Sequence, residues 1–314
     1  MERNDGLPAI ILMAYGSPNS LDEVADYLAQ VRGGRGSSQE EIDHLKQRYR
    51  RVGGLTPLLQ VTRSQADALE KKLFADGFHV KVSYGMKHWH PFVEDVVEKI
   101  DLDNPSVLVG FALAPHYSKL SIGGYEDSVR RGLAKKNSKT RFVMVKSWHT
   151  QPSLINALSS RVRNSLQRMG GSAGTVVIFT AHSLPIRAVL EDDPYKIQLL
   201  ETSKLVAEEA KVTEWEFAFQ SASGPSGTWL GPSLKEKISQ LSTTGTRQIL
   251  VCPVGFVSDH LEILYDLDVE AKEFAESHGI VLARTPSLND DPGLIDALAA
   301  VVRPILVSEE IAAN

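Results

Sequence analysis

The sequence predicts an α/β fold made of two similar doubly wound lobes, each with a parallel sheet flanked by helices. Short runs rich in Val, Ile and Phe alternate with longer helix-like segments, as in sheets with helical crossovers. Several runs are apolar throughout, which is typical of strands buried on both faces. The chain also resembles itself, because IILMAYGSP at 10–18 is similar to VIFTAHSLP at 177–185.

The apolar runs define the expected strands, and the segments between them define the expected helices. Turn signals such as Asp103-Asn104-Pro105 and Gly170-Gly171-Ser172 separate the two kinds of segment. The expected strands are Ala9–Ala14, Val80–Tyr84, Ser106–Phe111, Phe142–Val145, Val176–Thr180, Glu216–Gln220, Gln248–Val251 and Ile280–Ala283. The expected helices are Leu21–Val31, Ser38–Arg51, Val61–Phe74, Pro91–Ile100, Gly124–Ala134, Gln151–Arg168, Gln198–Ala210, Asp259–Glu276 and Pro292–Ile305.

A second pair of similar segments supports two related halves. GFALAP at 110–115 and VCPVGF at 251–256 each end a Val- or Leu-rich strand. We therefore expect lobes at 1–150 and 151–314. In such folds ligands bind beyond the carboxyl ends of the strands. The polar residues there are the candidate site residues, namely Tyr15, Lys87, His88, His116, His182 and the segment Asp259–Glu270.

Composition excludes several classes of protein. A formal net charge of -5 and a pI near 6 argue against a general nucleic-acid binder. The single cysteine, Cys252, excludes an internal disulfide and any metal or iron–sulfur site made of four cysteines. No apolar stretch reaches the ~18 residues of a membrane span, and no signal-peptide pattern opens the chain. These features predict a cytoplasmic protein without an integral membrane segment.

Common catalytic motifs are absent or misplaced. The sequence contains no G-x-G-x-x-G, no phosphate-binding G-x-x-x-x-G-K-[ST] and no H-E-x-x-H. The segment at 170–174 matches G-x-S-x-G, but it precedes a strand, whereas a nucleophile elbow follows one.

The segment Asp259–Glu270 carries the strongest chemical pattern. Residues four apart share one face of a helix, so Glu262, Asp266 and Glu270 are expected to form a row of carboxylates. An acidic row is most often a solvated helix face. Here no Lys or Arg lies within the segment, and the row follows a buried-looking strand. We therefore expect it to conduct cations or protons.

His182 is the second candidate. It follows its strand at the position that self-similarity makes equivalent to Tyr15. A single histidine is more often a hydrogen-bonded structural residue. However, a neutral imidazole with an ordinary pKa of ~6.5 accepts a proton near neutral pH, and a nearby carboxylate stabilises the imidazolium.

Seven segments together resemble the ferrochelatase family, whose enzymes insert ferrous iron into a porphyrin. They occur in the family's order across nearly the whole chain, and TAHSLP with GFVSDHLE is the most specific pair. The resemblance implies a lyase of haem biosynthesis with two Rossmann-like halves and the porphyrin in the cleft between them. The segments are MAYGSP (13–18), GGLTPL (53–58), YGMKH (84–88), LAPHYS (113–118), TAHSLP (180–185), WLGP (229–232) and PVGFVSDHLEILYD (253–266).

The resemblance also implies roles for individual residues. His182 and Glu262 match the family's active-site pair, to which metal binding and proton abstraction are assigned, and imidazole and carboxylate are ligands that Fe2+ accepts. Asp266 and Glu270 match the acidic row beyond the pair, and Tyr15 matches a residue on the opposite side of the macrocycle. Positions that contact propionates or shape the pocket wall are matched by Arg32, Arg48, Thr56, Gln65, Lys87 and Tyr125.

Tyr15 and the HLEILYD segment look most like the ferrochelatases that use coproporphyrin III. The expected substrates are therefore coproporphyrin III and Fe2+, with no prosthetic group, no iron–sulfur cluster and transient contact with neighbouring haem-pathway enzymes. Gly33-Gly34 departs from relatives that have a second Arg beside the position of Arg32. The alternatives are protoporphyrin IX as substrate, a chelatase for another metal and tetrapyrrole, and a non-catalytic tetrapyrrole carrier.

Overall fold

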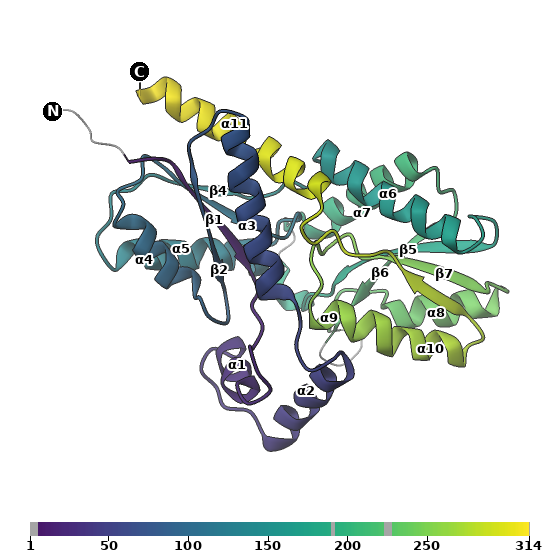
Figure 1. Cartoon of the computed structure of the whole chain (residues 1–314). Coiled ribbons are helices and arrows are strands. Elements are labelled where there is room, and N and C mark those ends of the chain that lie inside the picture. Colours follow the sequence, from purple (N-terminus) through teal and green to yellow (C-terminus); the bar gives the residue numbers. More distant parts are fainter. Residues whose placement is uncertain (1–5, 190–191, 223–227, 314) are drawn as a thin grey trace.

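Two parallel sheets form the centre of the protein, seen in a computed structural model that describes residues 6–189, 192–222 and 228–313 (Figure 1). Their strand orders are β2-β1-β3-β4 and β6-β5-β7-β8. The two orders are equivalent, so the sequence repeat corresponds to two copies of one topology. The strands are β1 (Ala9–Ala14), β2 (Lys81–Met86), β3 (Leu108–Ala112), β4 (Phe142–Val145), β5 (Thr175–His182), β6 (Trp215–Gln220), β7 (Gln248–Cys252) and β8 (Val281–Arg284).

Strands β1 and β5 have the same place in their sheets. Each lies between two parallel neighbours, β1 between β2 and β3 and β5 between β6 and β7. Tyr15 directly follows β1, and His182 is the last residue of β5. The repeated fold therefore presents a tyrosine in one lobe and a histidine in the other, both at carboxyl ends of strands.

Helices flank both sheets (Figure 1). The α-helices are α1 (Val24–Val31), α2 (Gln39–Arg51), α3 (Leu58–Ala75), α4 (Val93–Asp101), α5 (Gly124–Ala134), α6 (Pro152–Arg168), α7 (Tyr195–Ala210), α8 (Leu234–Thr243), α9 (Leu261–Leu264), α10 (Lys272–Ser277) and α11 (Pro292–Ala313). The shorter elements are the π-helices η1 (Lys119–Gly123) and η3 (Asp266–Ala271) and the 3-10 helix η2 (Ile186–Ala188).

Every predicted strand is present, with its ends within two residues of the prediction. Among the described residues one α-helix is absent from the prediction: α8, which begins with a capping box between Ser233 and Glu236. That Ser-x-x-Glu spacing is a recognisable helix start. The short helices η1 and η2 are absent from the prediction too. The predicted end of the last helix at Ile305 is also wrong, because α11 continues to Ala313 with Pro304 inside it.

The single helix predicted over Asp259–Glu276 is wrong. The chain there forms the short helix α9, then the π-helix η3 and then α10. In η3 the Glu270 amide donates to the Tyr265 carbonyl, five residues earlier. Such π-helical turns within helices are frequent at functional sites.

The two lobes are joined by more than the chain passing between their sheets. Helix α11 packs against α3 of the first lobe as well as α6 of the second, and in Figure 1 it begins near α6 and passes α3. Arg303 of α11 pairs with Asp76 at the end of α3. The predicted division at residue 150 separates the strands of the two sheets, but the last helix stabilises both lobes.

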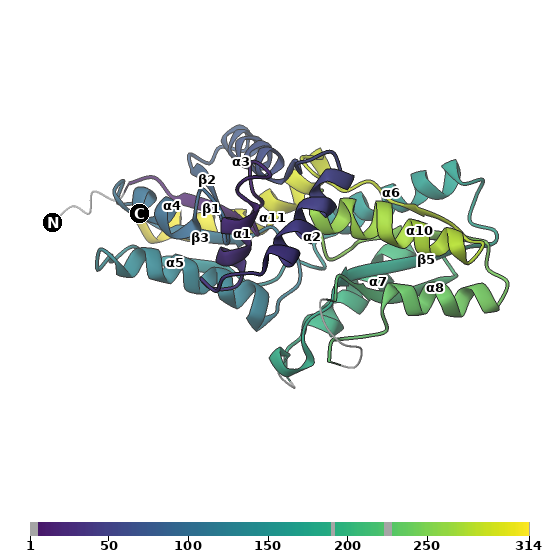
Figure 2. The ribbon, with the colours of Figure 1, turned by 90° about the horizontal axis from the view of Figure 1, so that it is seen from below.

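Helices α1 and α2 lie in front of the junction between the lobes when the molecule is seen from below (Figure 2). Val24 and Tyr49 of these helices form an apolar cluster with Leu261 of α9. The first lobe therefore contacts the segment that carries the acidic row. Among the described residues, no helix combines the length and the apolar character needed to cross a membrane.

Candidate active site

His182 and Glu262 are in contact. The Nε2 atom of His182 lies 3.2 Å from Oε1 of Glu262, and its Nδ1 atom bonds the Ser183 carbonyl. The two side chains keep 28% and 35% of their surface exposed, so a ligand can reach them. Strand β5 positions the histidine and α9 positions the glutamate, which brings together two residues that are 80 positions apart in the chain.

The contact decides the protonation of the pair. A carbonyl only accepts hydrogen bonds, so Nδ1 of His182 is a donor, and Nε2 faces a carboxylate that also accepts. Burial opposes the imidazolium, but the Glu262 charge outweighs it and raises the pKa of His182 to about 9. Burial likewise opposes ionisation of Glu262, yet His182 holds the pKa of Glu262 well below its usual range. In the resting site the carboxylate of Glu262 thus stabilises the imidazolium form of His182.

The carboxylate row is compensated, contrary to the expectation from its own segment. Asp266 pairs with Arg48 of α2 and accepts a hydrogen bond from the Ser221 hydroxyl at the end of β6. Glu270 lies 3.2 Å from the ammonium of Lys235 in α8. The cations come from other elements, so the local sequence carried no signal of them.

Asp266 has the carboxyl best suited to exchange protons near neutral pH. Burial raises its pKa to about 6, with help from the charges of Glu262 and Glu270, although Arg48 and Ser221 act in the opposite direction. The influence of both glutamates shows that the three carboxylates remain within electrostatic reach of one another across the α9–η3 boundary.

The resemblance assigned no role to two residues that lie near the pair, although His260 falls within the candidate segment Asp259–Glu270. Nε2 of His260 lies 3.7 Å from Oε2 of Glu262, and its Nδ1 bonds the Ser258 carbonyl at 2.9 Å. The ring of Trp229 lies 6.4 Å from that of His182. Both belong to segments that carry the resemblance, GFVSDHLE and WLGP, which is the signal that was available.

Tyr15 is the counterpart of His182 in the first lobe. Its side chain is 45% exposed, and its ring lies 4.5 Å from the His88 ring. Burial of the hydroxyl and the charge of Glu262 both raise the pKa of Tyr15. The charge of Glu262 in the second lobe thus influences Tyr15 in the first.

Lys87 and Tyr125 of the first lobe are in contact with each other. The Lys87 ammonium lies 5.1 Å from the centre of the Tyr125 ring, and it packs over Gly124 so closely that a Cβ there would lie 2.4 Å from Nζ. Burial lowers the pKa of Lys87. Tyr125 itself is buried and shapes the wall beneath the ammonium.

The remaining predicted contact residues differ in their surroundings. Arg32 pairs with Glu41 at the surface, and Thr56 bonds Ser17 at 2.9 Å. Gln65 has no exposed surface and donates to Ser258 Oγ and to the Asn289 carbonyl. Its predicted contact with the porphyrin is therefore corrected: Gln65 joins the two lobes behind the loop that leads to Glu262.

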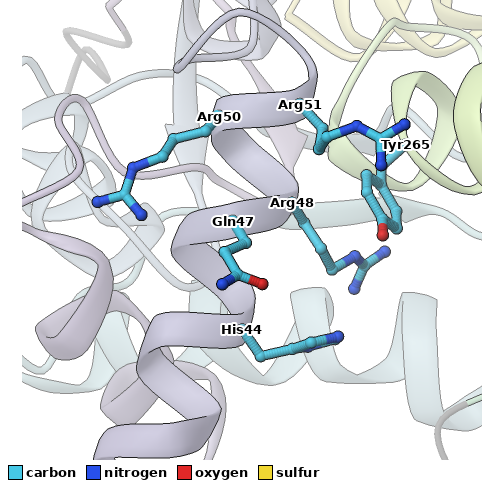
Figure 3. Close-up of a pocket in the computed structure, with 6 residues that line it drawn as sticks. All are labelled: His44, Gln47, Arg48, Arg50, Arg51 and Tyr265. Carbon is cyan, nitrogen blue, oxygen red and sulfur yellow. The ribbon is translucent and has the colours of Figure 1, made fainter.

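Arg48 lines a cavity of about 320 Å³ between α2 and the π-helical segment. Its guanidinium lies 4.7 Å from the ring of Tyr265, in addition to its contact with Asp266. In Figure 3 the side chains of Arg48 and Arg51 extend toward Tyr265, whereas Arg50 points away. The cavity residues are His44, Gln47, Arg48, Arg50, Arg51 and Tyr265.

The described residues contain no group of three or more His, Cys, Asp or Glu side chains arranged to hold a metal ion. The His182–Glu262 pair supplies one imidazole and one carboxylate, with His260 beside them. These are donors that a ferrous ion accepts.

Comparison with known proteins places this site in a family. The sequence profile of the ferrochelatase family matches residues 8–305. A ferrochelatase of Herpetosiphon aurantiacus is 43% identical over 94% of this chain and 97% of its own. A ferrochelatase of Deinococcus radiodurans is 39% identical over 93% and 94% of the two chains. A coproporphyrin III ferrochelatase of Geobacillus thermodenitrificans is 38% identical over 96% of each.

Solved structures support the fold. SirB from Bacillus subtilis with Fe3+ superposes with a TM-score of 0.59 at 14% identity, over 97% of each chain. The cobalt complex of the sirohydrochlorin chelatase SirB from Bacillus subtilis subspecies spizizenii gives 0.56 at 12% identity, also over 97% of each chain. At these identities the likeness concerns the two-lobed architecture alone. With a profile match over nearly the whole chain and relatives of about 40% identity, the chain belongs to the ferrochelatase family of lyases.

Proposed function

We propose that this ferrochelatase inserts Fe2+ into coproporphyrin III, with His182 and Glu262 as the catalytic and metal-binding pair. The contact between these two side chains at the end of β5, with the charge of Glu262 acting on Tyr15, is the observation that carries the proposal. Tyr15 would face the macrocycle from the first lobe, and Asp266 and Glu270 would relay protons or metal beyond the pair.

The protonation of the pair suggests an order of events. Insertion exchanges one Fe2+ for the two N–H protons of the porphyrin, so the site must remove two protons. The resting pair already carries one proton, because the pKa of His182 is about 9. A dication approaching Glu262 would weaken the hold on that proton, and Asp266, with a pKa of about 6, is suited to pass it to solvent. His182 would then be free to take the two pyrrole protons in turn, the first passing to Asp266 and solvent before the second is accepted.

The substrate proposal rests on relatives and on cationic groups. Coproporphyrin III carries four propionates where protoporphyrin IX carries two, and propionates pair with Arg and Lys. Lys87, Arg32 and Arg48, together with Thr56 and Tyr125 in the wall, are the residues we propose for this role. Several relatives are named as coproporphyrin III ferrochelatases, whereas the two relatives with the highest identities above carry the general name.

We further propose that iron is a substrate and that no prosthetic group takes part. The single cysteine of the chain supports this for an iron–sulfur cluster, which requires more thiolates than one residue supplies. We place the enzyme in the cytoplasm, where transient contact with neighbouring haem-pathway enzymes would deliver porphyrin and remove product.

The test is anaerobic Fe2+ insertion into coproporphyrin III and protoporphyrin IX side by side, followed by absorbance. His182→Ala and Glu262→Gln are the active-site variants. Asp268→Asn is the matched control, because Asp268 lies on the π-helix that follows α9 but pairs with Arg284 away from the row. We expect preferential turnover of coproporphyrin III that is lost in both active-site variants and kept in the control.

The other outcomes would redirect the proposal. Equal or better turnover of protoporphyrin IX would overturn the choice of substrate. Full turnover by His182→Ala and Glu262→Gln would remove the pair from its catalytic role. Binding of both porphyrins without iron insertion would favour a tetrapyrrole carrier.

A further inference from the structure

Gln220, in strand β6, connects the strand that carries His182, β5, with the helix that carries Glu262, α9. It is the last residue of β6, its side chain is 5% exposed, and it lies directly opposite His182 in the parallel register of β5 and β6. Its main-chain carbonyl accepts a hydrogen bond of 2.8 Å from the amide of Ser183, the residue after His182. The main chain directly after His182 is thereby fixed to β6.

The side chain of Gln220 makes a different pair of bonds. Its Oε1 accepts from the Thr180 hydroxyl at 2.8 Å, and its Nε2 donates to the Glu262 carbonyl at 3.2 Å. The amide therefore joins β5, two residues before His182, to the main chain of Glu262. The Thr180 hydroxyl donates to the oxygen of the Gln220 amide, so the nitrogen of the amide faces Glu262 and donates to its main-chain carbonyl.

Glu262 depends on such an anchor. Helix α9 has only four residues and is followed at once by a π-helix, so it has few internal bonds to fix its direction. The neighbour of Gln220, Ser221, bonds the Asp266 carboxylate. The end of β6 thus holds the first two carboxylates of the row, one by its main chain and one by its side chain.

We propose that Gln220 is a positioning residue that holds His182 and Glu262 at contact distance. It would act through the main chain of Glu262 and the strand of His182 without touching substrate itself. Loss of its amide would let α9 move away from β5 and separate the pair. The inference rests on the roles proposed above for His182 and Glu262.

The same strand supplies a matched control. At the opposite end of β5, the Thr175 hydroxyl donates to Oε1 of Gln248 at 2.9 Å, which is the same kind of bond between the same residue types. Thr175 and Thr180 are both buried. Thr175 and Gln248 lie at the amino-terminal ends of their strands, away from the pair. Substitutions at either end remove one hydroxyl–amide bond between neighbouring strands, and only those at the carboxyl end remove the proposed anchor.

The experiment compares Gln220→Met and Thr180→Val with Gln248→Met and Thr175→Val in the full-length enzyme. Steady-state iron insertion gives kcat and KM for the porphyrin. The His182 ring is followed by NMR titration of histidine-labelled protein, its signal being identified by its absence in His182→Ala. The charged groups that act on this ring are Glu262 and Asp266 from the α9–η3 segment. His260 lies 3.7 Å from Glu262, and Tyr195 of α7 donates to the main-chain carbonyl of His182.

We expect kcat to fall by about tenfold in Gln220→Met and Thr180→Val, as for loss of one well-placed hydrogen bond that orients reacting groups. KM should stay within about twofold, because the porphyrin contacts are untouched. The His182 titration should move toward lower pH as Glu262 withdraws. The two control variants should show neither change. Thr180→Val carries the test if Gln220→Met does not fold.

Three results would overturn the inference. The first is a loss of kcat that is no greater than in the control variants. The second is an effect on KM alone, and the third is a fall in kcat while His182 titrates as in the unchanged enzyme. Failure of the proposed roles is distinguishable, because His182→Ala and Glu262→Gln would then retain turnover whatever Gln220→Met does.

Discussion

The two lobes place a π-helical turn after equivalent strands but give it opposite chemistry. In the first lobe η1 follows β3 and has the sequence KLSIG, with Lys119 as its charged residue. In the second lobe η3 follows β7 and has the sequence DLDVEA, with three acidic residues. The two lobes share a π-helical turn at this position, but the turn is basic in the first lobe and acidic in the second.

The difference extends to the residues around each turn. The first lobe presents Lys87 beside Tyr125 and the partly exposed residue Tyr15. The second lobe presents His182 with a carboxylate row. A duplicated fold has therefore specialised into one side suited to anionic groups of a ligand and one side suited to protons and cations. The predictions below test that division, beginning with the acidic side.

The largest effect is expected for Glu262→Gln. Removing the charge deprives His182 of its partner, and loss of a positioned acid or base lowers kcat by about 10² to 10⁴-fold. Asp268→Asn, on the π-helix that follows α9, should remain near full activity, since its carboxylate pairs with Arg284. The measurement is anaerobic iron insertion. Similar losses in the two variants would mean that negative charge along the α9–η3 segment, and not the pair, is what matters.

Asp266→Asn should have the next largest effect, on the order of tenfold in kcat. The pKa of Asp266 is about 6, so its carboxylate is ionised above that pH and protonated below it. In the unchanged enzyme kcat should fall as the pH drops through about 6. The variant should lack this acid limb. A pH profile that keeps the limb in Asp266→Asn would assign it to another group.

Two tyrosines give a smaller test of the same comparison. Tyr195 of α7 donates to the His182 carbonyl at 3.0 Å, and Tyr27 of α1 donates to the carbonyl of Gly16, next to Tyr15, at 3.1 Å. Tyr27 lies in the first α-helix after β1, and Tyr195 lies in the first α-helix after the equivalent strand β5. Tyr195→Phe should lower kcat by about three- to tenfold through loss of one bond that holds the histidine.

Tyr27→Phe serves as the paired variant, because it loosens the backbone beside Tyr15 and leaves His182 in place. Its effect on kcat should be the smaller of the two. The reverse order would show that the tyrosine side of the site limits the reaction. Thermal unfolding of both variants checks that their folds are equally stable.

The smallest effect is expected at the ion pairs of α2. Arg51 and Glu273 are both more than half exposed, so Arg51→Gln should leave kcat and its pH profile unchanged. Arg48 holds the pKa of Asp266 down, so Arg48→Gln should move the acid limb of kcat to higher pH. The same shift in both variants would indicate a general effect of charge on α2 instead of the Arg48–Asp266 contact.

Much of the fold was predictable from local sequence. The strands are short apolar runs, and their burial on both faces leaves a pattern in consecutive residues. The equivalence of Tyr15 and His182 was visible because the two strands and the turns after them resemble each other. Helix α8 and its capping box were also local, and they were missed although the Ser233–Glu236 spacing indicated a start.

Other features were decided only by tertiary structure. The acidic row looked uncompensated because its cations, Arg48 and Lys235, come from elements distant in the chain. Gln65 appeared to be a wall residue, yet its partner Ser258 is 193 positions away and in the other lobe. Residue type and spacing cannot report such pairings.

The sequence by itself determined the two-lobed α/β architecture and marked His182 and Glu262, since apolar periodicity and short motifs are properties of neighbouring residues. The tertiary structure decided the π-helical turn at η3, the protonation of the pair and the anchoring of Glu262 by Gln220. These depend on which charges and hydrogen-bond donors the folded chain brings within about 4 Å of one another, where electrostatic energy rises steeply.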